Sequence, residues 1–459
     1  MIRKFINFLG IATSVAILAS CSGATESFED NQVETKQETA VEENNNASLL
    51  ARFVAENEIA TRLSEDETLW TTDSKVTDLY PIYIAGVDGV AYYECKVETN
   101  GEDAGYVLVS VTKNDILIPE TAEEGKTLTE QYAKVLGTEN FNVLRYDYFS
   151  SSAESSDVSR SGNSGILLAT KGFFDGNICV AETSRSSSSD WYYDYKDNFG
   201  KKVIENGAVP QYTKEAMDVF YKDVNFTISR GGSKVEVPYI KGGTHYKLKN
   251  STARWYQIKD YKGISAGCGN TAWTILYGYW HRYKGKNKLF NISNLSSYWT
   301  KSGSTNSYIS SVTWLLYGYT GSERWGNTTS TCTYPYTNPG MSNGIEYAQD
   351  KGYNASVSCK TLWADWQGAT NNIINEIRND RPVILYFDCK SANGEYFKYH
   401  YAVITGVKEH YWTNSDLTTQ LRLNVNDGWG DGDRQIYAFT HDVNVKTTNC
   451  FDYYTVNIK

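Results

Sequence analysis

Residue alternation in two stretches near the C-terminus constrains the fold more than any other feature. In residues 398–407, His400, Ala402 and Ile404 would share one face of an extended chain, and in residues 421–425 apolar and polar residues alternate throughout. Because successive side chains of a strand point to opposite faces, each stretch predicts a strand with a buried face. His400 would head an apolar face, where a polar side chain needs a hydrogen-bonding partner.

A helix is predicted immediately after Cys268. Downstream of this cysteine, Ala272, Ile275, Leu276 and Tyr279 recur at the spacing of an amphipathic helix. A thiol at a helix N-terminus feels the positive end of the helix dipole, which lowers its pKa and favours the nucleophilic thiolate. The flanking glycines leave room for a substrate carbonyl to approach. The competing interpretation is a buried structural cysteine between two turn glycines.

Composition and charge remove several classes of protein. The chain has 459 residues, for which two or three domains are expected. It has 41% hydrophobic residues, which predicts a globular protein, and its net charge of −10 without a basic cluster argues against nucleic-acid binding. The 8 cysteines form no CxxC pair and show no ligand spacing with the 5 histidines, so neither a metal nor another cofactor is expected.

The first residues predict export and lipid anchoring. Residues 1–20 have a basic start and an apolar stretch, and Leu18-Ala19-Ser20-Cys21 resembles the lipobox of bacterial lipoproteins, in which the cysteine is diacylated. An ordinary secretory signal that happens to precede a cysteine is the alternative. Residues 21–48 are acidic and polar, which predicts a disordered tether. We therefore expect an extracytoplasmic protein held on the membrane of a bacterial cell envelope, at the outer membrane or cell surface.

The rest of the chain divides into three predicted parts. Residues 49–150 combine a helical pattern with strand-like runs, which indicates a small α+β domain. Residues 151–190 form a connecting region, in which the Ser-rich stretches 150–164 and 184–189 are expected to be exposed and open to proteolysis. Residues 191–459 are long enough for a domain with its own core.

His400 and Asn426 complete a catalytic arrangement with Cys268. A cysteine nucleophile needs an imidazole to take its proton and a third group to orient that imidazole. His400 lies about 130 residues after Cys268, which is the separation typical of papain-type chains. Asn426 ends the second predicted strand, where its amide could hold the imidazole.

Together these motifs resemble the papain-like cysteine peptidases. Cys268 at a helix start, His400-Tyr401-Ala402-Val403 on a strand and Asn426-Asp427-Gly428-Trp429-Gly430 after the next strand are similar to the streptopain group and, more distantly, to the bacteriocin-processing peptidases. The resemblance implies an α+β fold in which the cysteine helix packs on an antiparallel sheet that carries the histidine and the asparagine. In the bacteriocin-processing relatives an aspartate orients the histidine, so Asp427 competes with Asn426, which we favour.

The resemblance also assigns roles upstream of the cysteine. Trp255-Tyr256-Gln257 is similar to the motif whose glutamine amide helps the backbone N–H of the cysteine to form the oxyanion hole, which makes Gln257 the candidate donor. The run Gly105-Tyr106-Val107-Leu108-Val109-Ser110 is similar to the prodomain hairpin of the streptopain group. Residues 49–150 would then be a prodomain. The alternative is a small β-rich domain of no catalytic consequence.

We therefore expect a lipid-anchored cysteine endopeptidase that hydrolyses protein or peptide substrates and is made as a zymogen. Two other functions remain as alternatives, and each would give a different experimental result. A cell-wall amidase would release muropeptides, but such compact domains usually place cysteine and histidine closer together in the sequence. A non-catalytic adhesin or glycan-binding lipoprotein would suit the 36 tyrosines and 12 tryptophans, and would not react with a thiol-directed peptidyl electrophile.

Replacing the cysteine of the lipobox tests the anchor. We expect Cys21→Ser to move the protein from the detergent phase to the aqueous phase, because the acyl chains lose their attachment site. Incorporation of labelled palmitate measures the same change independently. A variant that stays in the detergent phase would show that another segment holds the protein on the membrane.

Overall fold

The computed structural model describes most of the chain after residue 46. The described residues are 47–459 apart from 64–67, 85–88, 112–117, 146–150, 156–165, 172–177, 182–224, 231–232, 239–241, 300–306, 325–330, 363–365, 391–396, 411–419, 431 and 439–447. The predicted signal peptide, Cys21, nearly all of the tether and the Ser-rich stretch 184–189 lie outside the described residues. All described residues belong to one unit of the chain, residues 45–459.

A large mixed sheet runs through this unit. Its strands are β1 (Ser74–Ile84), β2 (Tyr92–Thr99), β3 (Glu102–Ser110), β4 (Glu120–Ala122), β5 (Phe141–Arg145), β6 (Ser151–Ser155), β7 (Leu167–Lys171), β8 (Ile178–Val180), β11 (Gly242–Lys247), β14 (Ala355–Thr361), β15 (Val383–Lys390), β16 (Phe397–His410), β17 (Gln420–Asn426), β18 (Asp433–Ala438) and β19 (Thr448–Ile458). Neighbouring strands follow the order β14-β19-β15-β16-β17-β18-β4-β3-β2-β1-β5-β6-β7-β8, and β11 pairs with β16 beside this path. Two short pairs, β9 (Asn225–Arg230) with β10 (Ser233–Pro238) and β12 (Glu323–Arg324) with β13 (Thr331–Cys332), are separate.

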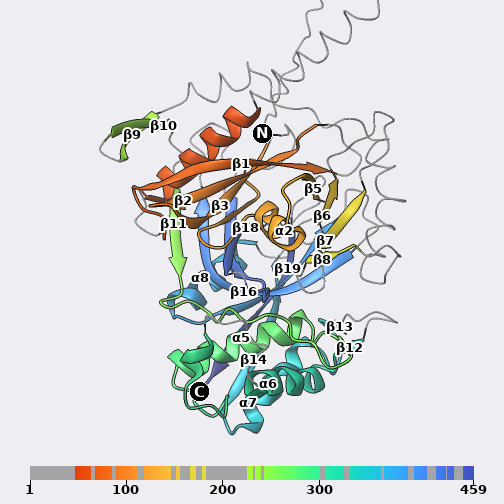
Figure 1. Ribbon diagram of the computed structural model, residues 1–459. Helices are drawn as coiled ribbons and strands as arrows, with labels where there is room; N and C mark the ends of the chain where they lie inside the picture. The colour runs from red at the N-terminus through yellow and green to blue at the C-terminus, as the bar shows by residue number, and fades with distance from the viewer. Residues whose placement is uncertain are drawn as a thin grey trace, which may run out of the picture. The chain divides into compact units, whose positions relative to one another are not determined.

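Helices accompany the sheet in both halves of the chain (Figure 1). They are a helix at 47–63, α2 (Leu128–Leu136), α5 (Cys268–Tyr283), α6 (Ser307–Tyr319), α7 (Glu346–Asp350) and α8 (Trp366–Arg378), with 3-10 turns η1 (Leu295–Tyr298) and η3 (Met341–Ile345). The predicted α+β class is therefore confirmed. Among the described helices, none combines the length and the apolar character needed to cross a membrane.

The N-terminal strands have two packed faces. Val107 of β3 belongs to a core shared with Leu50 of helix 47–63, whereas its neighbour Leu108 belongs to a core shared with Tyr132 of α2. The alternation of a strand places these two residues on opposite faces. Helix α2 begins after Thr127, which forms a capping box with the third residue of the helix. The helical and strand-like patterns predicted between residues 49 and 150 are therefore confirmed.

The start of the first Ser-rich stretch is a buried strand, so the expectation of an exposed break is wrong for residues 151–155. Strand β6 pairs with β5 and β7, and Ser151 and Ser152 are buried. The hydroxyls of Ser151 and Tyr132 are hydrogen-bonded at 3.0 Å. The serine content indicates polarity, but only the packed structure supplies the partners that allow these hydroxyls to be buried.

Strand β4 joins the two halves of the sheet, because it pairs with β3 on one side and with β18 on the other. Buried charges reinforce this junction. Arg62 donates hydrogen bonds to Glu58 at 2.8 Å, to Glu123 at 2.7 Å and to Gln435 at 2.6 Å, and Arg422 donates to Glu58 at 3.0 Å. Burial alone would lower the pKa of Arg62, but the two carboxylates raise it above its usual value. Loss of one charged partner would leave another charge buried, so the network holds helix 47–63 on β17 and β18.

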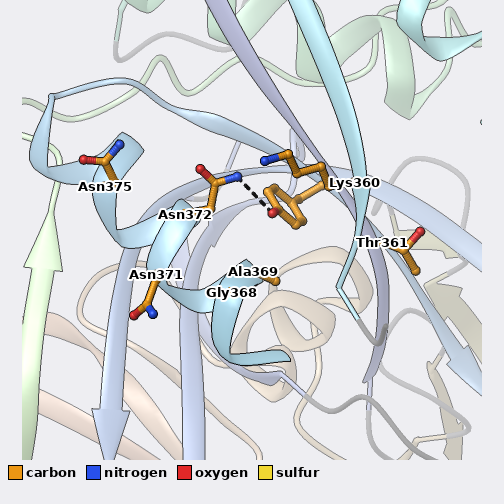
Figure 2. A pocket seen from close by; sticks show the side chains of 8 residues that line it. Lys360, Thr361, Gly368, Ala369, Asn371, Asn372 and Asn375 are labelled. Carbon is orange, nitrogen blue, oxygen red and sulfur yellow. Dashed lines mark hydrogen bonds between the residues drawn. The ribbon is translucent and has the colours of Figure 1, made fainter. Parts of the chain in front are cut away.

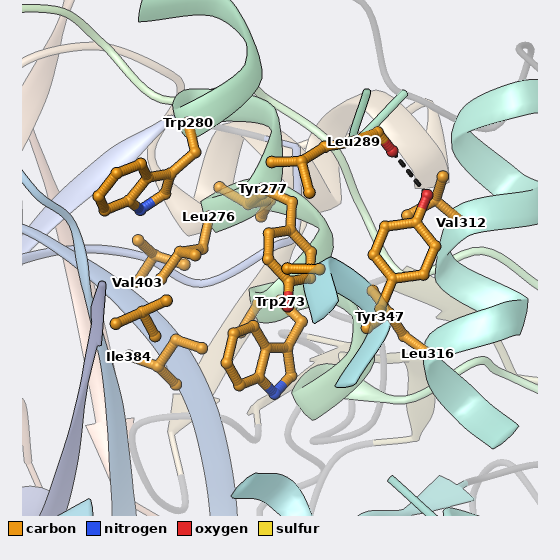
Figure 3. Packing of buried hydrophobic residues seen from close by; sticks show 14 of the residues in the cluster. Trp273, Leu276, Tyr277, Trp280, Leu289, Val312, Leu316, Tyr347, Ile384 and Val403 are labelled. Atoms are coloured by element: carbon orange, nitrogen blue, oxygen red, sulfur yellow. Dashed lines mark hydrogen bonds between the residues drawn. The ribbon is translucent and has the colours of Figure 1, made fainter. Parts of the chain in front are cut away.

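Helix α5 packs on one face of the C-terminal strands. Figure 3 shows Trp273, Leu276 and Trp280 of this helix beside Ile384 of β15 and Val403 of β16. The predicted helix after Cys268 is thus confirmed, and its apolar stripe is the surface that meets the sheet. Burial of these large side chains removes apolar area from water, which stabilises the contact.

The opposite face of the same strands packs against α8. Ile373 and Ile377 of α8 share a core with Leu385 of β15 and with Ala402 and Ile404 of β16. Consecutive residues of β15 and β16 therefore enter different cores, as the period of two in the sequence predicts. The strands expected at 398–407 and 421–425 are confirmed as parts of β16 and β17.

Gly278 allows α5 to approach the segment that carries Gln257. A Cβ atom added at Gly278 would lie 2.7 Å from the ring of Trp255, closer than real Cβ contacts. The Trp255 ring is held from its other sides: its Nε1–H donates to the Tyr298 carbonyl at 2.9 Å, and Trp299 packs against it at 5.7 Å between ring centroids. The close approach therefore positions Trp255, two residues before Gln257.

The substitution Gly278→Ala tests this contact. We expect a loss of about 1–3 kcal/mol in the free energy of unfolding, because overpacking outweighs the gain in helix propensity. Urea denaturation measures the change. Gly318→Ala is the matched control, since this exposed glycine of α6 has no atom within 4 Å of an added Cβ. The control should be neutral or stabilising by up to about 1 kcal/mol. Equal effects of the two substitutions would contradict the role of Gly278.

Candidate active site

Cys268 is the first residue of α5, and its half-buried sulfur lies against β16. Gly267 precedes it with φ 90°, a left-handed conformation that favours glycine. The backbone N–H groups of Tyr401, Gly269 and Cys268 itself lie near the sulfur and favour its thiolate form. Burial nevertheless raises the pKa of Cys268 to about 11, because loss of hydration outweighs these donors. The expected lowering of the thiol pKa is therefore corrected: at neutral pH this thiol is protonated.

His400 is buried in β16 with a defined tautomer. Its Nε2–H donates to the backbone carbonyl of Asp427 at 2.8 Å, which leaves the lone pair of the neutral ring on Nδ1. Its ring packs against Phe387 and Trp429, with centroids 5.8 and 5.3 Å away. Burial lowers the pKa of His400 to about 4; the Asp427 carbonyl opposes this shift and the charge of Arg434 adds to it. The imidazole is therefore neutral at pH 7.

The structure brings Cys268 to the backbone of β16 beside His400, but not to the same face of the strand. Cys268 packs against the core that contains Tyr401 and Val403. The ring of His400 faces the other way, toward Phe387, which belongs to the core under α8. A thiolate–imidazolium pair requires the two side chains to meet, and in this arrangement both groups are neutral instead.

Asn426 organises the loop after β17. Its Nδ2–H donates to the Thr252 hydroxyl and to the Ala253 carbonyl, both at 2.9 Å, and its Oδ1 accepts from the backbone N–H of Gly428 at 2.9 Å. The orienting contact expected between the Asn426 side chain and His400 is thus corrected, because the backbone carbonyl of Asp427 makes that contact. Asn426 acts on the imidazole through the shape of the loop.

The carboxylate of Asp427 points away from this role. It lies 3.9 Å from Nε of Arg434, whose guanidinium stacks over the ring of Trp429 at 5.2 Å. Trp429 is only partly buried, whereas the His400 ring that it packs against is almost fully buried. Neither the Asn426 side chain nor the Asp427 side chain therefore orients His400. The backbone carbonyl of Asp427 makes that contact, while the Asn426 side chain hydrogen-bonds Gly428 and the Asp427 carboxylate faces Arg434.

Gln257 carries an unused hydrogen-bond donor close to Cys268. Its Oε1 accepts from the Ser265 hydroxyl at 3.0 Å, and that hydroxyl accepts from the backbone N–H of Gly267 at 3.1 Å. The backbone N–H of Gln257 donates to the Gly428 carbonyl at 3.1 Å. Its Nε2 is buried and has no hydrogen-bond partner among the residues that the structure describes. A buried donor without an acceptor lowers stability. Proteins retain such a donor where a negatively charged oxygen must bind, as in an oxyanion hole.

Cys332 and Lys171, which no sequence pattern singles out, also lie near the candidate site. The Cys332 thiol of β13 contacts the Tyr399 hydroxyl, and the Lys171 ammonium of β7 lies over Trp429 at 5.4 Å from the ring centroid. Tyr399 and Tyr401 flank His400 on β16, so both point to the face of the strand opposite His400. This alternation is the sequence signal that could have placed both tyrosines on the face that meets Cys268. Nothing in the sequence around Lys171 signals its contact with Trp429.

Other parts of the described chain offer no competing centre. No group of three or more His, Cys, Asp or Glu side chains within the described ranges could hold a metal ion. A pocket of about 440 Å³ opens between α8 and the strands β14 and β19 (Figure 2), lined by Lys360, Thr361, Gly368, Ala369, Asn371, Asn372, Asn375 and Tyr453. None of the predicted site residues lines this pocket, so it is separate from Cys268 and His400.

Comparisons with known proteins give only weak similarity. No family model matches the chain. No curated protein matches it by sequence. The chain is similar to a fragment of prointerpain A from Prevotella intermedia, with a TM-score of 0.34 and 11% identity over 78% of this chain and 90% of that one. It is also similar to the active interpain A cysteine protease of that organism, with a TM-score of 0.29 and 13% identity over 46% of this chain and 95% of that one. Likenesses this weak establish neither a shared fold nor a shared activity.

The raised thiol pKa predicts a slow reaction of Cys268 with iodoacetamide at neutral pH. We expect the alkylation rate at Cys268 to rise with pH toward a midpoint near 11, because only the thiolate reacts. Mass spectrometry of the peptide that contains Cys268 measures this rate, with circular dichroism to verify the fold at each pH. Free cysteine, whose rate has its midpoint near pH 8.5, is the reference. A rate at Cys268 that levels off below pH 8 would contradict the burial argument.

Proposed function

We propose that this protein is a papain-like cysteine peptidase with Cys268 as nucleophile, His400 as base and Gln257 as oxyanion donor. The observation that carries the proposal is the contact between Cys268 and the backbone of Tyr401. It holds a helix-starting thiol against the peptide group that follows a buried histidine. The unpartnered Nε2 of Gln257 supports the same assignment, because it is a donor kept without an acceptor.

The chemistry requires a rearrangement that brings Nδ1 of His400, which faces the core under α8 in this structure, to the sulfur. The Cys268 proton then passes to Nδ1, and the thiolate attacks the peptide carbonyl carbon to form a C–S bond. The oxygen becomes negative and is held by Gln257 Nε2 and the backbone N–H of Cys268. Cleavage of the C–N bond follows as the imidazolium gives its proton to the leaving amine. Water hydrolyses the thioester and restores the thiol.

We further propose that the full chain is a zymogen. Its neutral thiol and neutral imidazole suit a resting enzyme, and the N-terminal half lies over the loop that holds His400. Lys171 of β7 covers Trp429, while β4 pairs with β18 next to that loop. Because residues 151–155 form a buried strand, we place the activating cut in the Ser-rich stretch 184–189.

The lipobox resemblance completes the proposal with a place of action. A diacylated Cys21 would hold the peptidase on the membrane of the cell envelope, with its substrates among the proteins or peptides outside the cytoplasm.

Hydrolysis of casein by the full chain tests the proposed function. We expect Cys268→Ala and His400→Ala to lower kcat by at least about 10³-fold, because each removes a group that bonds to the reacting atoms or transfers their proton. Asn426→Ala should cost less, since Asn426 acts through the loop. Cys359→Ala and His410→Ala are the matched controls and should retain activity. Autolytic shortening of wild type, accompanied by rising activity, would support the zymogen. Full activity in Cys268→Ala would overturn the mechanism.

A further inference from the structure

A second cysteine, Cys332, lies beside Cys268. A Cβ atom added at Gly267 would be 3.2 Å from Cβ of Thr331, and one added at Gly269 would be 2.9 Å from Cβ of Thr333. The residues on both sides of Cys268 therefore touch the residues on both sides of Cys332. A Cβ at Gly269 would therefore force a shift of Thr333, and one at Gly267 would crowd Thr331 in a backbone conformation that favours glycine.

Strand β16 brings the two thiols to one surface. The Tyr399 hydroxyl contacts the Cys332 sulfur, and Cys268 packs against the cluster that contains Tyr401. The Tyr401 hydroxyl donates to the carbonyl of Thr333, next to Cys332, at 3.3 Å. Tyr399 and Tyr401 share one face of the strand, so the segments that carry the two cysteines meet the same pair of tyrosines.

The electrostatics agree with this closeness. Burial is the main cause of the raised pKa of Cys268, and the neighbouring Cys332 raises it further. The pKa of Tyr399 is raised first by burial and then by both cysteines. Both thiols are free, Cys332 buried and Cys268 half-buried, so an oxidant reaches Cys268 first.

We propose that Cys268 and Cys332 form a reversible disulfide, in which Cys332 is the resolving cysteine for an oxidised Cys268. The proposal names hydrogen peroxide as the oxidant class. Once Cys268 has lost its proton, its thiolate attacks one peroxide oxygen, the O–O bond breaks, and the products are a sulfenic acid and hydroxide. The Cys332 thiolate then attacks the Cys268 sulfur, the S–O bond breaks, and a second hydroxide leaves. Both hydroxides take up the two thiol protons to become water.

This inference deepens the proposed function, on which its biological meaning rests. A disulfide would block the nucleophile while the enzyme is exposed to oxidants outside the cytoplasm, where such bonds persist. It would also protect Cys268 from sulfinic acid, which thiols do not reduce. Reduction would return a competent thiol, so Cys332 would make the nucleophile recoverable.

Graded treatment of the full chain with hydrogen peroxide tests the proposal without relying on activity. We expect the intact mass to fall by two hydrogen atoms, and peptide mapping to find Cys268 linked to Cys332. In Cys332→Ser, the Cys268 peptide should instead gain two or three oxygen atoms. Cys359→Ser is the matched control and should form the same disulfide as wild type. Thermal unfolding of each variant verifies that it is folded.

Casein hydrolysis gives the second measurement. Dithiothreitol should restore most of the activity of peroxide-treated wild type and Cys359→Ser, but little in Cys332→Ser. Sulfinic acid at Cys268 of wild type without the linked peptide would overturn the disulfide, whatever the activity. A linked peptide in a chain that hydrolyses no substrate, even after limited proteolysis, would support the disulfide and overturn the proposed function instead.

Discussion

The pleat of β16 governs both the core and the candidate site. Neighbouring residues of a strand face opposite ways, so the backbone of Tyr401 can meet Cys268 while the ring of His400 faces Phe387 and Trp429. The same alternation divides apolar residues between the core under α5 and the core under α8. A slip of one residue would exchange these faces. Pairing with β15 and β17 on either side therefore protects the register on which the site depends.

Burial explains why the candidate site is neutral in this structure. Removing a charge from water is costly unless an opposite charge lies close by, so an isolated buried thiol and imidazole both favour their uncharged forms. Cys268 and His400 have pKa values shifted in the directions that suppress ionisation, to about 11 and about 4. Only a change that brought the two side chains together, or let water reach them, would stabilise the charged pair.

The N-terminal half is bound to the C-terminal half by main-chain and ionic contacts. Strand β4 shares hydrogen bonds with β18, and Glu58 accepts from both Arg62 and Arg422. Removal of this half would expose an edge of β18 and deprive Arg422 of that carboxylate. A cut in the chain would therefore not separate the halves by itself, because these contacts persist after the backbone is broken. The proposed zymogen thus needs dissociation as well as cleavage.

The sequence by itself determined the local elements and the residues that could carry chemistry. Periodicity located the helix after Cys268 and the strands around His400 and before Asn426, because a helix and a strand repeat apolar residues at different spacings. It could not determine which face of β16 would meet α5, because an alternating pattern shows that two faces differ but not which helix packs on each face. Only the tertiary structure decided that Asp427 holds His400 through its main chain, that serines of β6 are buried, and that Cys332 lies beside Cys268. These features depend on atoms distant in sequence, whose desolvation and hydrogen bonding no local pattern records.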